Sequence, residues 1–383
     1  MRIARIECLA YRASLSEPFG FSQWWFKERS ACLVRVCTDD GVEGWGEIFA
    51  NVHPAIYGPI VEEVLAPLYL GASPLDRDVL WENAYNRTRD FGRKGVVVSA
   101  LSGLDIALWD LAGKILGVPV STLLGGGRRR RIEAYASGLY FRERENVAAA
   151  LAEEASGYAA QGFKHVKMKV GRGVEEDARN VREVRAALGP DVGLSIDANH
   201  AYGVASAVKL GRLAAEYDLE WFEEPVAPED LAGYAEVRAK QPAPVAGGEA
   251  EYTRFGFRDM LLARAVDIAQ PDLCAAGGLS EGRKIAALTS AFGALLQPHV
   301  WGTPVGTAAA LHFLDWLPPV PGSATPWEPL LELDQTEHPV RDAMIRLPNE
   351  LPYFAAPSGP GLGIEVSPDD VAGFLVGTWV AGK

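Results

Sequence analysis

The sequence predicts an α/β fold in two parts, a smaller N-terminal α+β domain and a larger domain of alternating strands and helices. Two observations predict it. The first 128 residues read as a strand, a hairpin and three helices, whereas apolar strand-like runs alternate with helical stretches beyond residue 129. Eight strands in βα order indicate a closed parallel barrel or a doubly wound sheet. The length of 383 residues suits a barrel plus an accessory domain.

The N-terminal part begins with the alternating segment RIARIECLAYRASL, which is typical of a strand. In ACLVRVCTDDGVEGWGE, two alternating runs flank Asp39-Asp40-Gly41, a strong turn signal, so this segment predicts a hairpin. Three helices are expected near residues 54–70, 74–89 and 95–116, the last ending at Gly117.

The second part contains eight expected strands separated by helices. The resulting division is a domain over 1–128, a βα domain over 129–335, and a segment over 336–383 that returns to the first domain. The strands expected from the apolar runs are residues 132–137, 165–170, 193–199, 219–224, 244–249, 266–272, 294–300 and 322–328.

Composition excludes several classes of protein. The net charge of −13 argues against nucleic acid and against an anionic membrane as partners. The four cysteines form no CxxC pair and have no zinc spacing, as expected of reduced thiols in a cytoplasmic protein. The N-terminus reads as a strand and not as a signal peptide, and no apolar run reaches membrane-spanning length.

Three carboxylates, Asp197, Glu223 and Glu249, are expected at the ends of three successive strands. Parallel barrel strands direct their C-terminal ends to one mouth, where the active sites of this fold lie. Three anions aimed at one point repel each other unless a cation joins them. An all-carboxylate site suits a hard cation, Mg²⁺ before Mn²⁺. A lone strand-end carboxylate that pairs with a loop is the alternative for each residue.

Two lysines, Lys167 and Lys169, share one face of the expected strand 165–170. Inward lysines in a buried strand need an anion, and like charges lower each other's pKa. The pair is therefore one way to obtain a neutral lysine base near neutral pH. A solvated strand edge is the alternative, which a barrel strand covered on both faces disfavours.

Asp272 and His299 end adjacent expected strands, so a carboxylate–imidazole hydrogen bond that raises the basicity of the imidazole is available. Glu332 is a candidate acid at the same mouth and is preferred over its neighbour Glu328. The remaining histidines are expected to be structural, with His200 the least certain because it follows Asn199 near the mouth; they are His53, His165, His200, His312 and His338.

A cation between a lysine and a histidine–aspartate pair suits the abstraction of a proton α to a carboxylate. A proton α to a carboxylate is weakly acidic, and its removal requires positive charge to hold the enediolate. Bases on opposite faces allow racemisation, or proton removal on one face with acid assistance on the other. A metallo-hydrolase is disfavoured, because metal-bound-water chemistry usually recruits histidine ligands.

At these residues the sequence resembles the enolase superfamily, in the mandelate racemase subgroup of its mandelate racemase/muconate lactonizing enzyme family. The motifs span nearly the whole chain; they are ALSGLDIALWDLAGK, KMK, DAN, WFEEP, GGE, QPD, PHVWG and PGLGIEV. The resemblance implies a modified (β/α)7β TIM barrel with an N-terminal α+β capping domain, Mg²⁺ as cofactor, a small carboxylate substrate and a homo-oligomer.

The resemblance also implies roles for individual residues. Asp197, Glu223 and Glu249 would bind Mg²⁺. Lys169 would be one base and His299 with Asp272 the other. Lys167 would hold the substrate carboxylate, Glu332 would assist at the enolate, and Asn199 would contact substrate.

Within the family, the segments WFEEPVAPEDLAGYAEVRAKQPAPVAGGE and DIAQPDLCAAGG most resemble galactarolactone cycloisomerases, which act on aldaric acid lactones. An acid-sugar dehydratase and a racemase or epimerase remain alternatives, because all three need the same residues. The likeness weakens at FGFSQWWFKERSA, where Trp24, Trp25 and Phe26 would form an apolar lid. Trp25 is expected to contact substrate, with packing of the hairpin as the alternative.

Overall fold

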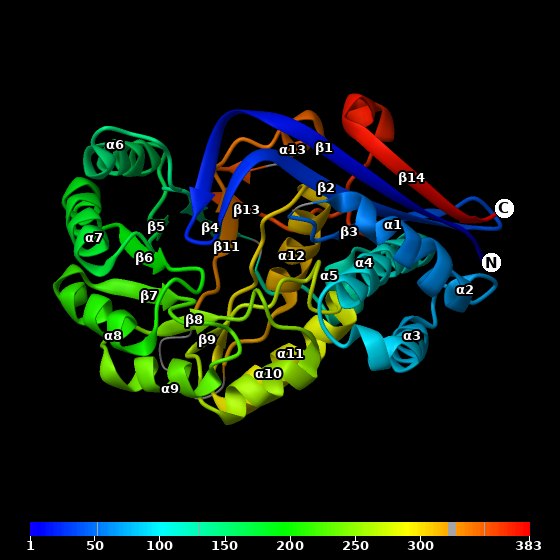
Figure 1. The fold of residues 1–383 in the computed structure, drawn as a ribbon. Helices are drawn as coiled ribbons and strands as arrows, with labels where there is room; N and C mark the ends of the chain where they lie inside the picture. The colour runs from blue at the N-terminus through cyan, green and yellow to red at the C-terminus, as the bar shows by residue number, and fades with distance from the viewer. Residues whose placement is uncertain (52, 130, 321–326, 348) are drawn as a thin grey trace.

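The computed structural model describes residues 1–51, 53–129, 131–320, 327–347 and 349–383. Its first domain is an antiparallel sheet in the order β14-β1-β2-β3, backed by helices. Figure 1 shows the long β1–β2 ribbon reaching from this domain across to the second one. The strands are β1 (Ile3–Phe21), β2 (Trp24–Thr38), β3 (Glu43–Ile48) and β14 (Leu375–Gly382).

Helices cover the sheet as the sequence predicts. The helix expected over 54–70 is a series of short turns, whereas the next two are continuous. The series consists of η1 (Pro54–Ile56), α1 (Tyr57–Pro59), η2 (Ile60–Leu65) and α2 (Ala66–Tyr69), and it is followed by α3 (Arg77–Gly92), α4 (Val96–Leu116) and α5 (Val120–Leu124).

Helix α4 is long and apolar enough to cross a membrane, but 94% of its most apolar window is buried inside the protein. It packs on β2 and β3, and Gly46 allows the contact because a Cβ there would lie 2.0 Å from the Gly103 carbonyl. Helix α4 is therefore the core helix of the first domain.

The second domain is a (β/α)7β barrel. Its parallel strands run in the order β11-β4-β5-β6-β7-β8-β9-β10, and each strand from β4 to β10 is followed by a helix. The Leu330 N–H donates to Gln297 Oε1 at 3.1 Å, which links the two ends of this order. The strands are β4 (Ile132–Ser137), β5 (His165–Lys169), β6 (Gly193–Asp197), β7 (Leu219–Glu223), β8 (Val245–Gly247), β9 (Ile268–Ala269), β10 (Leu295–Leu296) and β11 (Leu331–Asp334).

The barrel helices form the outer ring in Figure 1. A hydrophobic layer lies between them and the strands, and a smaller cluster around Tyr135 and Trp221 fills the barrel interior. The helices are α6 (Val147–Ala160), α7 (Val174–Leu188), α8 (Val204–Leu213), η3 (Ala215–Tyr217), α9 (Leu231–Lys240), α10 (Thr253–Leu262), α11 (Gly278–Phe292) and α12 (Pro304–Trp316).

Two strand expectations differ from the structure. The eighth strand is Leu331–Asp334, and most of the expected strand 322–328 lies outside the described residues. Strands β8, β9 and β10 have only two or three residues, so the polar residues expected at their ends follow them in loops. The loops after these short strands also contact one another, as in the bridge between Asp272 and His299, and this contact continues the barrel beyond the strands.

The chain after β11 runs back to the first domain. Strand β14 pairs with β1, from Arg5 with Gly382 to Tyr11 with Leu375. The elements between them are α13 (Pro339–Ala343), β12 (Asn349–Glu350), β13 (Tyr353–Phe354) and η4 (Pro368–Phe374).

The buried Asp110 of α4 joins three parts of the chain. Its Oδ2 accepts from the Trp45 N–H at 2.8 Å, and its Oδ1 accepts from the Leu362 N–H at 2.7 Å. Removing this carboxylate leaves two buried N–H groups without an acceptor, each at a cost of about 1–3 kcal/mol.

We therefore expect Asp110→Ala to lower the free energy of unfolding by about 2–5 kcal/mol, measured by urea denaturation. The exposed Asp90 of α3 provides the control, since Asp90→Ala should change stability by less than about 0.5 kcal/mol. Equal effects of the two substitutions would contradict the assigned role of Asp110.

Candidate active site

Polar side chains from seven barrel strands, β5 to β11, or from the loops that follow them, meet at the C-terminal mouth of the barrel. Lys169, Asp197 and Glu223 are the last residues of β5, β6 and β7. Their strands pair in register, Lys169 beside Asp197 and Asp197 beside Glu223. This pairing places the three side chains side by side at one level of the barrel.

The three predicted metal ligands lie together. One carboxylate oxygen each from Asp197, Glu223 and Glu249 falls within 4.8 Å of the other two. Asp197 and Glu223 are fully buried, and Glu249, in the loop after β8, is partly exposed. This donor set of three carboxylates with one accessible side fits a hard divalent cation that keeps positions open for substrate.

Both lysines form ion pairs with carboxylates at the mouth, including two of the three predicted metal ligands. The Lys169 Nζ lies 2.5 Å from Asp197 Oδ2, and the Lys167 Nζ lies 2.6 Å from Glu223 Oε1 and 2.9 Å from Glu332 Oε1. Burial alone would lower the pKa of Lys169, but the Asp197 carboxylate raises it above its usual range. Lys167 lowers the pKa of Lys169, as expected of like charges, but the anionic partners outweigh this repulsion, so the net pKa lies above its usual range.

On the other side, His299 and Asp272 form the predicted pair. The His299 Nδ1 lies 2.7 Å from Asp272 Oδ2, while its Nε2 lies 3.5 Å from Glu249 Oε2. Burial alone would lower the pKa of His299, but Glu249, Glu332 and Asp272 raise it to about 10. The ring is thus fixed by Asp272 with its other nitrogen directed to the carboxylate cluster.

Glu332 lies in β11 itself and not after the last strand. Besides Lys167, it contacts the backbone next to His299, because its Oε2 accepts from the Val300 N–H at 3.0 Å. Burial would raise the pKa of Glu332, but Lys167 and His299 lower it to about 2. The competing residue, Glu328, is exposed and pairs with Arg129 instead.

Asn199 lies at the edge of this cluster, and its neighbour His200 joins it there. The Asn199 Nδ2 donates to Glu224 Oε2 at 3.3 Å, and His200 Nε2 lies 2.7 Å from the same oxygen. Asn199, His200 and Glu224 all have positive φ values, of 41°, 67° and 44°. Such backbone strain collects at functional sites. His200 is therefore placed at the mouth, whereas His165, His312 and His338 bind structural partners.

Sequence reasoning missed the residues that hold Glu223, one of the predicted metal ligands. Glu223 Oε2 accepts from Trp221 Nε1 at 2.8 Å and from Gln270 Nε2 at 2.7 Å. Gln270 precedes Asp272 by two positions, and residues two apart in a strand face the same side of the sheet, so this spacing could have predicted that Gln270 faces the site. Tyr140 was also missed; its ring centroid lies 5.0 Å from the Lys169 Nζ.

The β1–β2 hairpin covers the mouth from the first domain. The Ser22 hydroxyl donates to the Ala198 carbonyl at 2.7 Å, and Gly20 pairs with Phe141. Phe26 is buried in an aromatic cluster with Tyr140 and Trp301. For Phe26 this is the alternative in which the aromatic side chain packs the hairpin against the barrel.

Trp24 and Trp25 are exposed on this hairpin. The Trp25 indole lies across Gly20 and lines a hollow of about 500 Å³ together with Arg142, Arg144 and Arg172. The residues lining this hollow are outside the carboxylate cluster. Trp25 therefore faces a hollow outside the carboxylate cluster, and its contact with substrate stays a prediction.

Fold and site together define a barrel enzyme that acts on a small carboxylate. The chain belongs to the enolase superfamily: residues 5–125 match the mandelate racemase / muconate lactonizing enzyme N-terminal domain, and residues 150–371 match the enolase C-terminal domain-like family. The family predicted from the sequence motifs is thus confirmed.

Relatives cover almost the whole chain. A D-galactarolactone cycloisomerase of Agrobacterium fabrum is 44% identical, over 98% of this chain and 99% of the relative. An arabinonate dehydratase of Saccharolobus solfataricus is 33% identical over 86% of each chain. The crystal structure of a racemase from Streptomyces coelicolor with bound magnesium has a TM-score of 0.87 at 29% identity, covering 98% of this chain and all of that one.

The metal prediction follows from the carboxylate geometry. We expect Mg²⁺ to raise the Tm, since a ligand at about 100 times its Kd stabilises a folded protein by about 2.7 kcal/mol. Glu249→Gln should remove most of this shift and weaken Mg²⁺ binding in a calorimetric titration. Glu328→Gln, at an exposed glutamate outside the cluster, should leave both unchanged. A Glu249→Gln variant that binds Mg²⁺ like the wild type would rule out Glu249 as a ligand.

Proposed function

We propose that this protein abstracts the proton α to the carboxylate of an acid sugar or its lactone, in a Mg²⁺-dependent reaction through an enediolate. Aldarolactone cycloisomerisation is the favoured reaction. One observation carries the proposal: Lys169 and His299 approach the same carboxylate cluster from two sides, Lys169 at Asp197 and His299 at Glu249. A substrate carboxylate at this cluster would present its α-carbon between the two bases.

Asp197, Glu223 and Glu249 would hold Mg²⁺, which supplies positive charge for the enediolate oxygens. The same charge has a second consequence. The carboxylates raise the pKa values of Lys169 and His299, so offsetting their charge favours the neutral forms that a base requires. This supports a division in which one base takes the proton while the other, still protonated, acts as an acid.

The remaining residues would orient the reacting carboxylate. Lys167 would add positive charge beside it, and Glu332 would assist at the enolate, while Asn199 and Trp25 would contact other parts of the substrate. In a lactone whose ring oxygen is bonded to the carbon β to the carboxylate, loss of the α-proton is followed by cleavage of the bond between that carbon and the ring oxygen, which leaves as a second carboxylate. The ring opens, and protonation of the enol gives the 2-keto acid.

The cycloisomerase is favoured because the 44% identical relative of that name spans the whole chain. Acid-sugar dehydration is the second candidate, and the 33% identical arabinonate dehydratase supports it. In the dehydration, His299 would protonate the departing β-hydroxyl. Racemisation or epimerisation would use both bases equally. A cytoplasmic homo-oligomer is part of the same proposal.

Proton NMR in D₂O with Mg²⁺ separates these reactions on a panel of aldarolactones, aldonates and aldarates. We expect lactone opening with one deuterium incorporated α to a carboxylate or carbonyl. Loss of water from an open acid would assign the dehydratase, and exchange with inversion alone the epimerase.

Two variants test the roles of the bases in the same assay. Lys169→Ala and His299→Ala should each lower turnover by about 10²-fold or more, with fold and Mg²⁺ affinity retained. Wild-type turnover in either variant would remove that residue from the mechanism. Absence of exchange with every compound, in a protein that binds Mg²⁺, would refute the proposed substrate class.

A further inference from the structure

The loop that carries His299 (residues 299–303, the His299 loop) is held by side chains of the first domain. We propose that Glu47 of β3, with Arg29 of the neighbouring strand β2, is a positioning residue that fixes His299 for proton transfer. The inference rests on the proposed function only in giving His299 a role as base or acid.

Glu47 is almost fully buried and binds the start of α12. Its Oε1 accepts from the Thr303 N–H at 2.8 Å. Its Oε2 accepts from the Thr303 hydroxyl at 2.6 Å and from the Gly306 N–H at 2.8 Å. A carboxylate on the N–H groups of a first helical turn is a favourable arrangement, so this end of the His299 loop is firmly anchored.

Phe49, the residue after β3, contacts the His299 ring directly and is linked to Asp272 through Cys274. The Phe49 N–H donates to the Cys274 carbonyl at 3.0 Å, and the Cys274 N–H donates to Asp272 Oδ1 at 2.6 Å. The Phe49 ring also lies edge-on to the His299 ring, with centroids 5.4 Å apart. One segment of the first domain thus sets the distance between the loops that carry Asp272 and His299.

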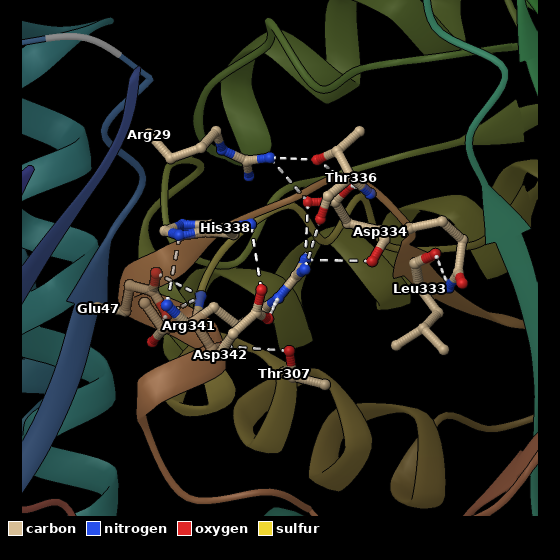
Figure 2. Close-up of polar contacts among 11 residues, drawn as sticks. Arg29, Glu47, Thr307, Leu333, Asp334, Thr336, His338, Arg341 and Asp342 are labelled. Carbon is tan, nitrogen blue, oxygen red and sulfur yellow. Dashed lines mark hydrogen bonds and ion pairs between the residues drawn. The ribbon is translucent and has the colours of Figure 1, made fainter. Parts of the chain in front are cut away.

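Arg29 holds the middle of the same loop. Its guanidinium carbon lies 3.6 Å from the centroid of the Trp301 ring, two residues after His299. Figure 2 shows this guanidinium pointing to Asp334 and Thr336, with Arg341 approaching Asp334 from another side. The Arg29 Nη1 lies 3.0 Å from Asp334 Oδ2, on the barrel strand that also carries Glu332.

The two bases are held in different ways. Lys169 and Asp197 belong to paired barrel strands, so their relative position follows from the β5–β6 register. His299 lies in a loop three residues beyond the two-residue strand β10. There the contacts from the first domain add to the barrel contacts with Asp272 and, through Val300, with Glu332. Loosening the first-domain contacts should therefore affect His299 before Lys169. A displacement of about 1 Å can lower kcat on the order of 10²-fold.

The test compares Glu47→Gln with the matched control Asp105→Asn. Asp105 is an equally buried first-domain carboxylate that accepts an N–H near the start of a barrel helix, from Ser280 at 2.9 Å. Glutamine keeps the size of Glu47 but sets an NH₂ group against N–H donors. Both variants should lose stability, so stability alone does not distinguish the two roles.

We expect Glu47→Gln to lower kcat by about 10-fold or more with KM changed less than about threefold, whereas Asp105→Asn leaves both near wild type. In protein labelled with ¹⁵N-histidine, the His299 ring resonances, assigned with His299→Asn, should shift in Glu47→Gln only. Arg29→Lys, which loses the planar stack on Trp301, should give the same signature if Glu47→Gln fails to fold.

The proposal is overturned if Glu47→Gln and Arg29→Lys leave kcat and the His299 resonances as they are in Asp105→Asn. The resonances report on the ring whether or not a substrate is turned over. A shifted His299 signal in a protein that exchanges no α-proton would therefore contradict the proposed function and leave the positioning role standing.

Discussion

The concentration of negative charge at the barrel mouth is the constraint on which the site depends. Five carboxylates, those of Asp197, Glu223, Glu249, Asp272 and Glu332, face two lysines and one histidine in a buried space. Such a cluster is stable only when each anion has a partner. In this structure the lysines and His299 fill that role, which raises their pKa values. A divalent cation would take over the pairing and release these groups for proton transfer. Under the proposed function, metal binding and activation of the bases would therefore be one electrostatic event.

The first domain does more than cover this site. The β1–β2 hairpin closes over the loop after β6, and β3 reaches the loops after β9 and β10. The chain returns to the same sheet as β14, and helix α4 also bonds to the barrel, so several separate segments join the two domains. A barrel mouth built from short strands gains its rigidity from this contact. The rigid lysine side and the externally supported histidine side together suit a reaction that needs two precisely placed groups.

Much of this was predictable from the sequence, for a physical reason. Repeating βα units place polar residues at a near-constant spacing, so Lys169, Asp197 and Glu223 could be assigned to one mouth before their distances were known. The predicted repulsion between the two lysines is present, but the attraction of the carboxylates 2.5–2.9 Å away is stronger, and only the distances show which of the two determines the lysine pKa values. The sequence misplaced the eighth strand, and the contact of Glu47 with Thr303 lies beyond any local pattern, since 256 positions separate them.

The primary kinetic isotope effect on kcat, measured with substrate deuterated α to the carboxylate, tests the central claim most directly. It should be measured in Mg²⁺ for the wild type and for a slowed His299→Asn variant, so that product release does not mask the chemical step. The account predicts that deuterated substrate reacts several-fold more slowly in at least one of these enzymes, because the α C–H bond breaks at the carboxylate cluster. Equal rates for both isotopes in both enzymes, despite turnover, would mean that this bond is not broken in a rate-contributing step, and would contradict the account.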